Sequence, residues 1–296
     1  MKVDASQPLS IMDGNNPFTI EQDQQTKKSY FKDLRQSFNL TYLIHKWFDE
    51  KYWKLVFCSS SYDCINKYPN IFLIYRTLLF VLTIIDLIYG IVIARPVQEW
   101  IIYFTHLTLL ITFLAIIFQF LITYRVNFYR GNQIVPQHYV QYIHIILILI
   151  SLSSGLVVCL IFWIFLYNPV VRLYSSLILD HGIIWLLFFI DIFLLTRLPI
   201  YMIDCIPLII FVFLYGLFTF IIFIFKFQFS RNRIGYVYRA FDFNNSPLRV
   251  TIQTILFIFF LPVLIMFILW NLFRLRRAID VKITNEREES AGNMMA

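Results

Sequence analysis

An ionisable pair stands inside an apolar stretch of this chain. Residues 175–195 are mostly apolar and, at about 21 residues, long enough to cross a bilayer once as a helix, yet they contain Asp180, His181 and Asp191. A charged side chain at the bilayer centre costs about 2.5–3.5 kcal/mol on insertion scales, so such residues are found there with a partner or a function. Asp180-His181 is therefore the first candidate for chemistry. The alternative is that both side chains only hydrogen-bond to neighbouring helices.

A hydroxyl group is predicted at the same depth in the membrane as this pair. Thr105 follows the start of the second apolar stretch by about five residues, and His181 follows the start of the fourth by about six, so both lie roughly 7–11 Å below one membrane face. A threonine hydroxyl becomes a nucleophile when a base removes its proton, and a histidine can do this near neutral pH. We therefore expect Thr105 as nucleophile and His181 as its base, with a hydrogen-bonded structural cluster as the alternative.

Other polar groups are expected around this pair. Asp180, Asp86 and His106 fall at the same depth by the same count along the helices, and they are predicted to support the reactive pair. The long loop before the last apolar stretch leaves the membrane on the same face, so Tyr238 and Asp242 are expected to cover the site. Three further residues are predicted nearer the opposite face: His144, Asp191 and Asp204.

A second cluster of charged side chains is expected at the turn between the fourth and fifth apolar stretches. Asp191, Arg197 and Asp204 are close together in the sequence around this short turn. Opposite charges within a few ångströms attract one another, most strongly where water is scarce. We interpret the three residues as an ion-pair clamp on the turn rather than as a path for ions.

The composition places the chain in a membrane. Hydrophobic residues make up 59% of the sequence and charged residues 15%, with a mean hydropathy of +0.69, whereas ordinary globular domains are roughly 45–50% apolar and 25% charged. The net charge of +7 comes from Lys and Arg at the flanks of apolar stretches and in the tails, which indicates topology and not nucleic-acid binding. The four cysteines form no CxxC pair, so neither a metal site nor a cofactor is expected.

The predicted fold is all-α, with six transmembrane helices and both tails on one side of the membrane. The six spans are expected at residues 71–93, 101–124, 142–166, 175–195, 200–225 and 250–273. Residues 1–28 are predicted to be a disordered polar tail, and residues 29–69 an interfacial amphipathic region, with packing against the bundle as the alternative. Residues 70–273 form the six-helix domain, and residues 274–296 a basic and then polar C-terminal tail.

Four short motifs resemble the rolling stone family and the broader androgen-induced family of multi-pass membrane proteins. The resemblance covers about residues 58–275, with the motifs in the family's order and spacing. The matching segments are Trp100-Ile-Ile-Tyr-Phe-Thr105, His181-Gly182-Ile183, Arg197-Leu-Pro199 with Pro207-Leu208, and Tyr238-x-x-x-Asp242.

The resemblance implies a lipid hydrolase site that is altered in this chain. Members of the androgen-induced branch hydrolyse fatty acid esters of hydroxy fatty acids with a threonine of the second helix and a histidine of the fourth. The threonine corresponds to Thr105. That branch reads His-Gly-x-His, and its acting imidazole is the second one, which is Ile184 here, whereas His181 matches the first. The branch also has Tyr-Pro where this chain has Tyr238-Arg239. The rolling stone branch lacks the second histidine and is linked to myoblast fusion.

We therefore expect a rolling stone-like integral membrane protein with an intramembrane polar pocket, either an altered or an inactive lipid ester hydrolase. Its ligands would be membrane lipid and fatty acid esters, and its location the endoplasmic reticulum or the plasma membrane. The alternative is a non-catalytic membrane protein that acts in cell-surface or membrane-complex assembly, where the polar cluster only locks the helices together.

Overall fold

The computed structural model describes residues 30, 32–38, 69–93, 99–128, 138–166, 175–196, 198–229, 233–238, 242–244 and 246–295. The chain divides into two units, Met1–Asn39 and Leu40–Ala296. In the first unit, residues 32–36 are helical. The tail predicted at residues 1–28 and most of the interfacial region predicted at residues 29–69 lie outside the described residues. The second unit carries the apolar helices and the candidate site.

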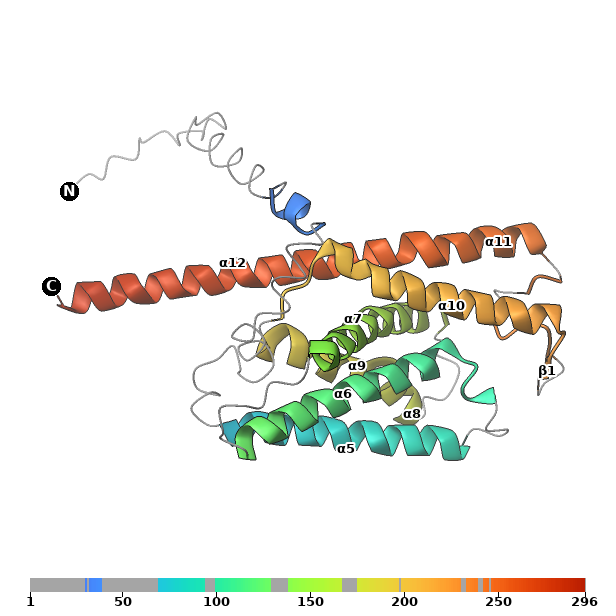
Figure 1. Cartoon of the computed structure of the whole chain (residues 1–296), viewed down its shortest axis with the longest axis horizontal. Helices are drawn as coiled ribbons and strands as arrows, with labels where there is room; N and C mark the ends of the chain where they lie inside the picture. Colours follow the sequence, from blue (N-terminus) through green and yellow to red (C-terminus); the bar gives the residue numbers. More distant parts are fainter. Residues whose placement is uncertain are drawn as a thin grey trace, which may run out of the picture. The chain divides into compact units, whose positions relative to one another are not determined.

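The second unit is built from helices (Figure 1). The first half contains α5 (Pro69–Ile93), α6 (Phe104–Phe128) and α7 (His138–Ile161), which continues as the π-helical segment η2 (Phe162–Leu166). A run of four short segments follows: α8 (Ser175–Ile178), π-helical η3 (Leu179–Ile183), α9 (Ile184–Ile190) and π-helical η4 (Asp191–Leu195). The last part contains the 3₁₀ turn η5 (Met202–Asp204), α10 (Cys205–Ile224), a two-residue antiparallel pair of β1 (Gln228–Phe229) and β2 (Arg233–Ile234), α11 (Pro247–Ile255), π-helical η7 (Leu256–Phe260) and α12 (Leu261–Met295).

Several of these helices can span a membrane, which confirms the predicted helical, multi-pass class. Five are long and apolar enough: Asn70–Ile93, Phe104–Arg125, Val140–Ile164, Met202–Ile224 and Pro247–Ile279. The fourth predicted span, residues 175–195, is not among these five: it is helical from end to end but is divided among α8, η3, α9 and η4. The polar tail predicted after residue 273 continues helix α12 as far as Met295.

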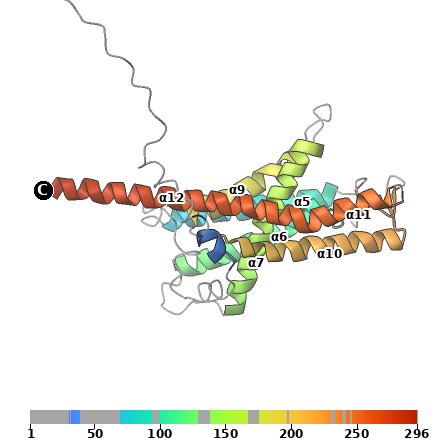
Figure 2. The same cartoon turned by 90° about the horizontal axis from the view of Figure 1, so that it is seen from above.

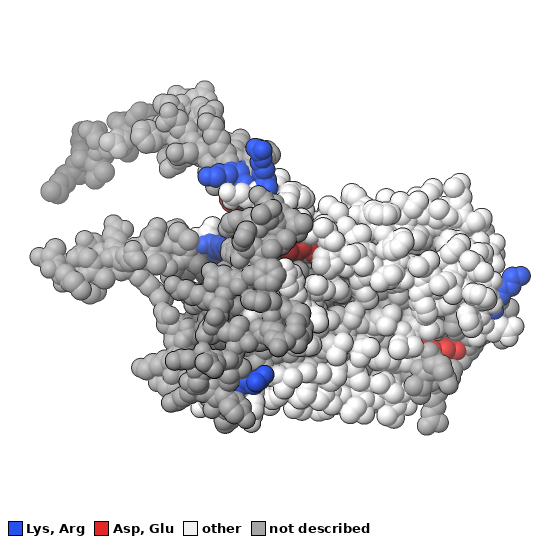
Figure 3. Space-filling model, in the orientation of Figure 1, with Lys and Arg blue, Asp and Glu red and all other residues white. Residues whose placement is uncertain are grey.

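The outer surface of the bundle is apolar, while polar side chains face inward. On α5, Ile74 is 57% exposed and Leu78 is 65% exposed, whereas Arg76 and Asp86 are each 1% exposed. This is the reverse of the pattern on a water-soluble helix, and it matches a helix that faces lipid. Figure 3 shows a broad face of the helices without charged side chains.

Helix α7 lies at the centre of the bundle. It packs against α6, α9, α10 and α12, and α5 packs against α6 and α9. Figures 1 and 2 both show α10 running beside α11 and α12. Ser151, Ser153 and Ser154 of α7 are fully buried, and such small side chains allow helix backbones to approach closely. These small residues of α7 therefore lie inside the bundle.

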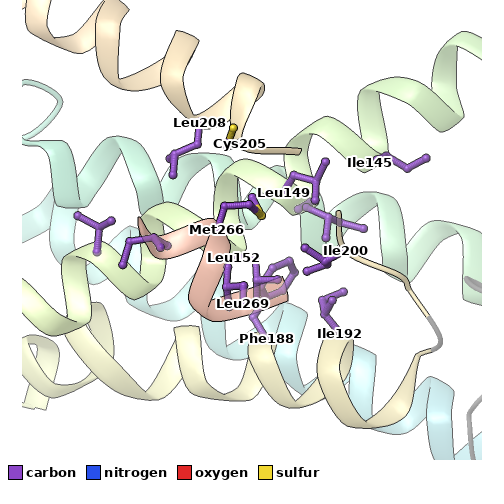
Figure 4. Packing of buried hydrophobic residues seen from close by; sticks show 14 of the residues in the cluster. Ile145, Leu149, Leu152, Phe188, Ile192, Ile200, Cys205, Leu208, Met266 and Leu269 are labelled. Atoms are coloured by element: carbon purple, nitrogen blue, oxygen red, sulfur yellow. The ribbon is translucent and has the colours of Figure 1, made fainter. Parts of the chain in front are cut away.

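An apolar core joins the central helix to its neighbours. Ile145, Leu149 and Leu152 of α7 meet Phe188 of α9, and Figure 4 shows the residues of α10 and α12 that complete the same cluster. Leu152 and Phe188 are fully buried. Because lipid tails are as apolar as these side chains, tight van der Waals packing rather than the hydrophobic effect stabilises such contacts in a membrane.

A buried ion pair joins α5 to η4. The Arg76 Nε and Nη2 atoms donate to the two carboxylate oxygens of Asp191, both at 3.0 Å, and Nη1 donates to Thr123 Oγ1 at 2.6 Å. The guanidinium also lies 4.0 Å from the ring centroid of Phe72. Arg76 and Asp191 are 1% and 0% exposed, so the pair is matched charge for charge inside the bundle.

The ion-pair clamp expected at the turn between the fourth and fifth apolar stretches involves a different partner for Asp191. Asp191 pairs with Arg76, which is 115 residues away in the sequence, and Arg197 lies outside the described residues. Asp204 accepts the backbone N–H of Tyr201 at 2.8 Å, which caps the start of η5. The counter-charge of Asp191 comes from α5, which packs against the fourth apolar stretch. Closeness in the sequence does not reveal such a contact.

Breaking this ion pair should destabilise the fold. Arg76→Met leaves the Asp191 carboxylate buried without its counter-charge, so we expect the free energy of unfolding to fall by about 3–5 kcal/mol. The double variant Arg76→Met/Asp191→Leu removes both charges and should recover most of that loss. Thermal unfolding in detergent measures both effects, with Arg125→Met, at an exposed position at the end of α6, as the control. A double variant no more stable than the single one would contradict this assignment.

Candidate functional site

A small cavity lies among α6, α7, η3 and α9. Its volume is about 20 Å³, which is room for one water molecule. A fatty acyl chain does not fit in this volume unless the helices move apart. The lining residues are Thr105, Thr108, Leu109, Thr112, Gly155, Val158, Asp180, Ile184 and Trp185.

One face of α6 supplies three hydroxyl groups to this cavity. Thr105, Thr108 and Thr112 are separated by three and four residues, so they lie on one side of the helix. Thr112 Oγ1 donates to the Thr108 carbonyl oxygen at 2.8 Å. Thr108 is 4% exposed, and within the described part of the chain its Oγ1 makes no hydrogen bond.

Asp180 brings a carboxyl group to the same wall, where it meets Asp86. Asp180 belongs to η3 and lines the cavity, and its carboxyl group lies within hydrogen-bonding reach of that of Asp86 from α5. Two carboxyl groups can hydrogen-bond to each other only when one of them carries a proton. Among the described residues, no N–H or O–H group donates to either oxygen of Asp86 or to Asp180 Oδ1. The two acids are therefore each other's polar partner.

His181 does not line the cavity. Its ring packs on Phe162 with centroids 3.9 Å apart, and its Nδ1 lies 3.1 Å from the Leu177 carbonyl oxygen one turn earlier. Because a carbonyl oxygen only accepts, Nδ1 carries the hydrogen and Nε2 holds the lone pair. The indole Nε1 of Trp163 donates to the His181 carbonyl oxygen at 2.9 Å. These contacts direct the predicted base toward η2 instead of Thr105.

His106 is held at the start of α6. Its Nδ1 lies 2.7 Å from the Trp100 carbonyl oxygen, and its ring stacks on the Trp100 indole with centroids 4.5 Å apart. It lies within electrostatic range of His181. Neither imidazole lines the cavity, although both were predicted at its depth.

Tyr238 covers the start of α6. Its hydroxyl oxygen accepts the backbone N–H of Phe104 at 3.0 Å, which is one of the first-turn donors that a helix leaves unpaired. The same hydroxyl hydrogen-bonds to Thr105 and to Tyr215, whose own hydroxyl donates to the Ile102 carbonyl oxygen at 2.9 Å. Burial raises the pKa of the Tyr238 phenol, so it stays neutral at physiological pH.

Asp242, the other residue expected to cover the site, stabilises its own loop. Its Oδ1 accepts the backbone N–H of Asn244 at 3.0 Å, and its carbonyl oxygen accepts that of Ser246 at 3.4 Å. This pattern of local bonds is typical of an Asx turn. Tyr238 is thus the loop residue that touches the candidate nucleophile.

Two residues of α9 and α7 were not predicted to shape the site. The Trp185 indole Nε1 donates to the Leu152 carbonyl oxygen at 2.9 Å and lies flat over Gly155. A Cβ atom at position 155 would sit 1.8 Å from Trp185 Cδ1, so only glycine permits this packing. Nothing in the sequence indicated that the Trp185 ring would pack on Gly155.

Comparisons with family models, with curated proteins and with solved structures give no match to this chain. The site must therefore be interpreted from its own geometry. Thr105, Asp180 and Ile184 share one cavity, Asp86 joins them through Asp180, and Tyr238 joins them through Thr105.

Adding a methyl group at position 155 should disturb the cavity wall. In Gly155→Ala the new Cβ must displace the Trp185 indole and break its bond to Leu152, so we expect a loss of about 1–3 kcal/mol in unfolding free energy. Gly182→Ala is the matched control, because its nearest neighbour, Trp163 Nε1, lies at an ordinary 3.5 Å. Thermal unfolding and tryptophan fluorescence report the change. Equal stability of the two variants would show that Trp185 does not lie over Gly155.

Proposed function

We propose that this chain is a rolling stone-like multi-pass membrane protein whose intramembrane pocket is an altered lipid ester hydrolase site. The observation that supports this best is that Thr105 and Ile184 line the same cavity. These are the positions that correspond, in the resemblance, to the nucleophile and to the acting histidine of the hydrolases. The hydroxyl is retained, and an isoleucine occupies the place of the imidazole.

The remaining acid–base groups are poorly placed to substitute for that imidazole. His181 belongs to the same helical run one turn before Ile184, a shift of about 4.5 Å along the axis, and its ring packs on Phe162. Catalytic geometry tolerates displacements much smaller than this. Asp180 is on the cavity wall, but its carboxyl group is engaged with that of Asp86. We infer that the wild-type protein hydrolyses lipid esters weakly or not at all.

The size of the cavity supports a second candidate, a non-catalytic protein of membrane-complex or cell-surface assembly. A space for one water molecule suits a polar cluster that holds α5, α6 and η3 together. The Arg76–Asp191 pair with Thr123 joins the same helices near the opposite end of α5. In this case the polar groups determine how the helices are arranged, and the apolar outer faces of the bundle bind the partners in the assembly.

The proposal includes six spans and an N-terminal interfacial helix. The run from Ser175 to Leu195 is about 31 Å long at α-helical rise, close to the thickness of the hydrocarbon core. It contacts α5, α6 and α7, and its own exposed side chains are apolar, among them Leu186 at 50% and Ile183 at 39%. A sixth crossing at this position places both tails on one side.

Topology labelling tests the sixth crossing. Single cysteines introduced as Ser10→Cys and Ser290→Cys in a background without the native cysteines should react with a membrane-impermeant maleimide from the same side of sealed vesicles. Labelling after permeabilisation is the control for reactivity. Modification of the two positions from opposite sides would mean an odd number of crossings.

An imidazole placed at position 184 should increase ester hydrolysis. We expect Ile184→His to raise hydrolysis of a fatty acid ester of a hydroxy fatty acid by about 10²-fold, the lower end of what a general base contributes. Thr105→Ala in the same background should abolish the gain, and it should also abolish any residual wild-type rate. Release of fatty acid by purified protein in mixed micelles, together with labelling by a fluorophosphonate probe, measures both effects.

Two matched variants separate the site from its surroundings. Ile183→His adds an imidazole on the exposed face of the same turn and should give no gain. Thr251→Ala removes an exposed hydroxyl on α11 and should leave rate and labelling unchanged. Robust wild-type hydrolysis that survives Thr105→Ala would overturn the site assignment, and robust hydrolysis lost in both Thr105→Ala and His181→Ala would establish an active enzyme with His181 as its base.

A further inference from the structure

The carboxyl groups of Asp86 and Asp180 meet inside the bundle without a counter-charge. Asp86 is 1% exposed, and neither of its oxygens accepts a hydrogen bond from an amide, hydroxyl or cationic donor in the described part of the chain. Asp191, by contrast, is equally buried and receives two bonds from Arg76. Asp86 and Asp191 thus belong to acidic sites of opposite character, one with a second acid beside it and one neutralised by arginine.

A second observation indicates that this acid site takes a ligand. Thr108 is 4% exposed and lines the cavity beside Asp180, yet its hydroxyl makes no hydrogen bond within the described residues. A buried hydroxyl without a partner is costly, and the cavity next to it is large enough for a water molecule. The polar residues that line this space are Thr105, Thr108, Thr112 and Asp180, so a water molecule bound there would have hydroxyl and carboxyl partners.

No cationic side chain faces the acid pair among the described residues around it. The neighbouring elements carry His106 at the start of α6, whose Nδ1 lies at the Trp100 carbonyl oxygen, and His181 in η3, whose Nδ1 lies at the Leu177 carbonyl oxygen. The walls from α7 and α9 consist of Gly155, Val158, Ile184 and Trp185. Two ionised carboxylates at this position would repel each other in a low dielectric, and a proton bound by the pair removes this repulsion.

We propose that Asp86 and Asp180 form a membrane-embedded proton-binding site, in which the two carboxyl groups share an exchangeable proton beside the threonine-lined cavity. A proton fits two carboxyl groups that lie within hydrogen-bonding reach of each other, because an alkali ion bound between them would separate their oxygens. The site occupies the same cavity as the proposed hydrolase site but does not depend on ester hydrolysis. It gives the protein a proton-responsive element on the contact between α5 and η3.

Infrared spectroscopy detects such a proton directly. The wild-type protein in lipid at neutral pH should show the carbonyl stretch of a protonated carboxyl group, and the double variant Asp86→Asn/Asp180→Asn should lack it. An amide pair can keep a hydrogen bond between the two positions, so the double variant is expected to fold. The band should be the same in sodium and in choline buffers. Identical wild-type and double-variant spectra in this region would overturn the proposal, and a band that sodium removes would identify an alkali-ion site instead.

Chemical modification locates the proton. Dicyclohexylcarbodiimide partitions into membranes and reacts with protonated carboxyl groups, so mass spectrometry should find it on Asp86 or Asp180 at neutral pH, where an ordinary aspartate is ionised. Asp191 is the internal control, because its carboxylate is paired with the Arg76 guanidinium. Modification of Asp191 with none at either member of the pair would contradict the proposal. Neither readout uses Thr105, so failure of the hydrolase proposal leaves this test unaffected.

Discussion

The ion pair between Arg76 and Asp191 is the interaction on which the arrangement of the site depends. It fixes α5 against the antiparallel run from Ser175 to Leu195 at one end. Ten residues further along α5 stands Asp86, and eleven residues back along the run stands Asp180, about 15 Å away on both helices. The charge-matched pair therefore sets the register that brings the two acids together. A shift of α5 along the run from Ser175 to Leu195 would leave Arg76 or Asp191 unpaired. Because the bilayer interior penalises an unpaired charge, this register is strongly preferred over shifted ones.

Depth in the membrane could be predicted from the sequence, but rotation about the helix axis could not. Counting residues from the ends of apolar stretches placed Asp86, Thr105 and Asp180 at one level, and the structure connects these three through Asp180 and the cavity. Counting also placed His181 there, yet adjacent residues of a helix point about 100° apart, so Asp180 and His181 cannot face the same cavity. The η3 segment is π-helical, a local change in winding that no pattern of apolar residues indicated.

Contacts between segments that are distant in the sequence also could not be predicted. Asp191 was expected to pair with a residue of the next turn, because that residue is near in sequence, whereas its partner comes from the first apolar helix. Trp185 over Gly155 and Tyr238 on the N–H of Phe104 are likewise contacts between segments separated by loops. Composition and periodicity predict which faces are apolar, but they do not predict which faces meet.

The hydroxyl, the two acids and the isoleucine together define a site that has kept its polarity without a base of suitable geometry. Thr105 is held by Tyr238 at the mouth of α6, and Asp180 is occupied by Asp86. Such a site binds water and a proton more readily than it activates a nucleophile. The proposed loss of hydrolysis and the proposed proton site are therefore two consequences of one arrangement, in which an apolar side chain stands where an imidazole would be needed.

The central claim is that α5 and η3 meet through Asp86 and Asp180, and cross-linking tests it most directly. In a background without the native cysteines, Asp86→Cys/Asp180→Cys should be joined by a short bifunctional thiol reagent in native membranes, and mass spectrometry should recover the two peptides as one. The pair Asp86→Cys/Ile183→Cys, whose second position faces lipid, serves as the control and should remain unlinked. Linking of the control pair in preference to the acid pair would contradict the arrangement on which the whole account rests.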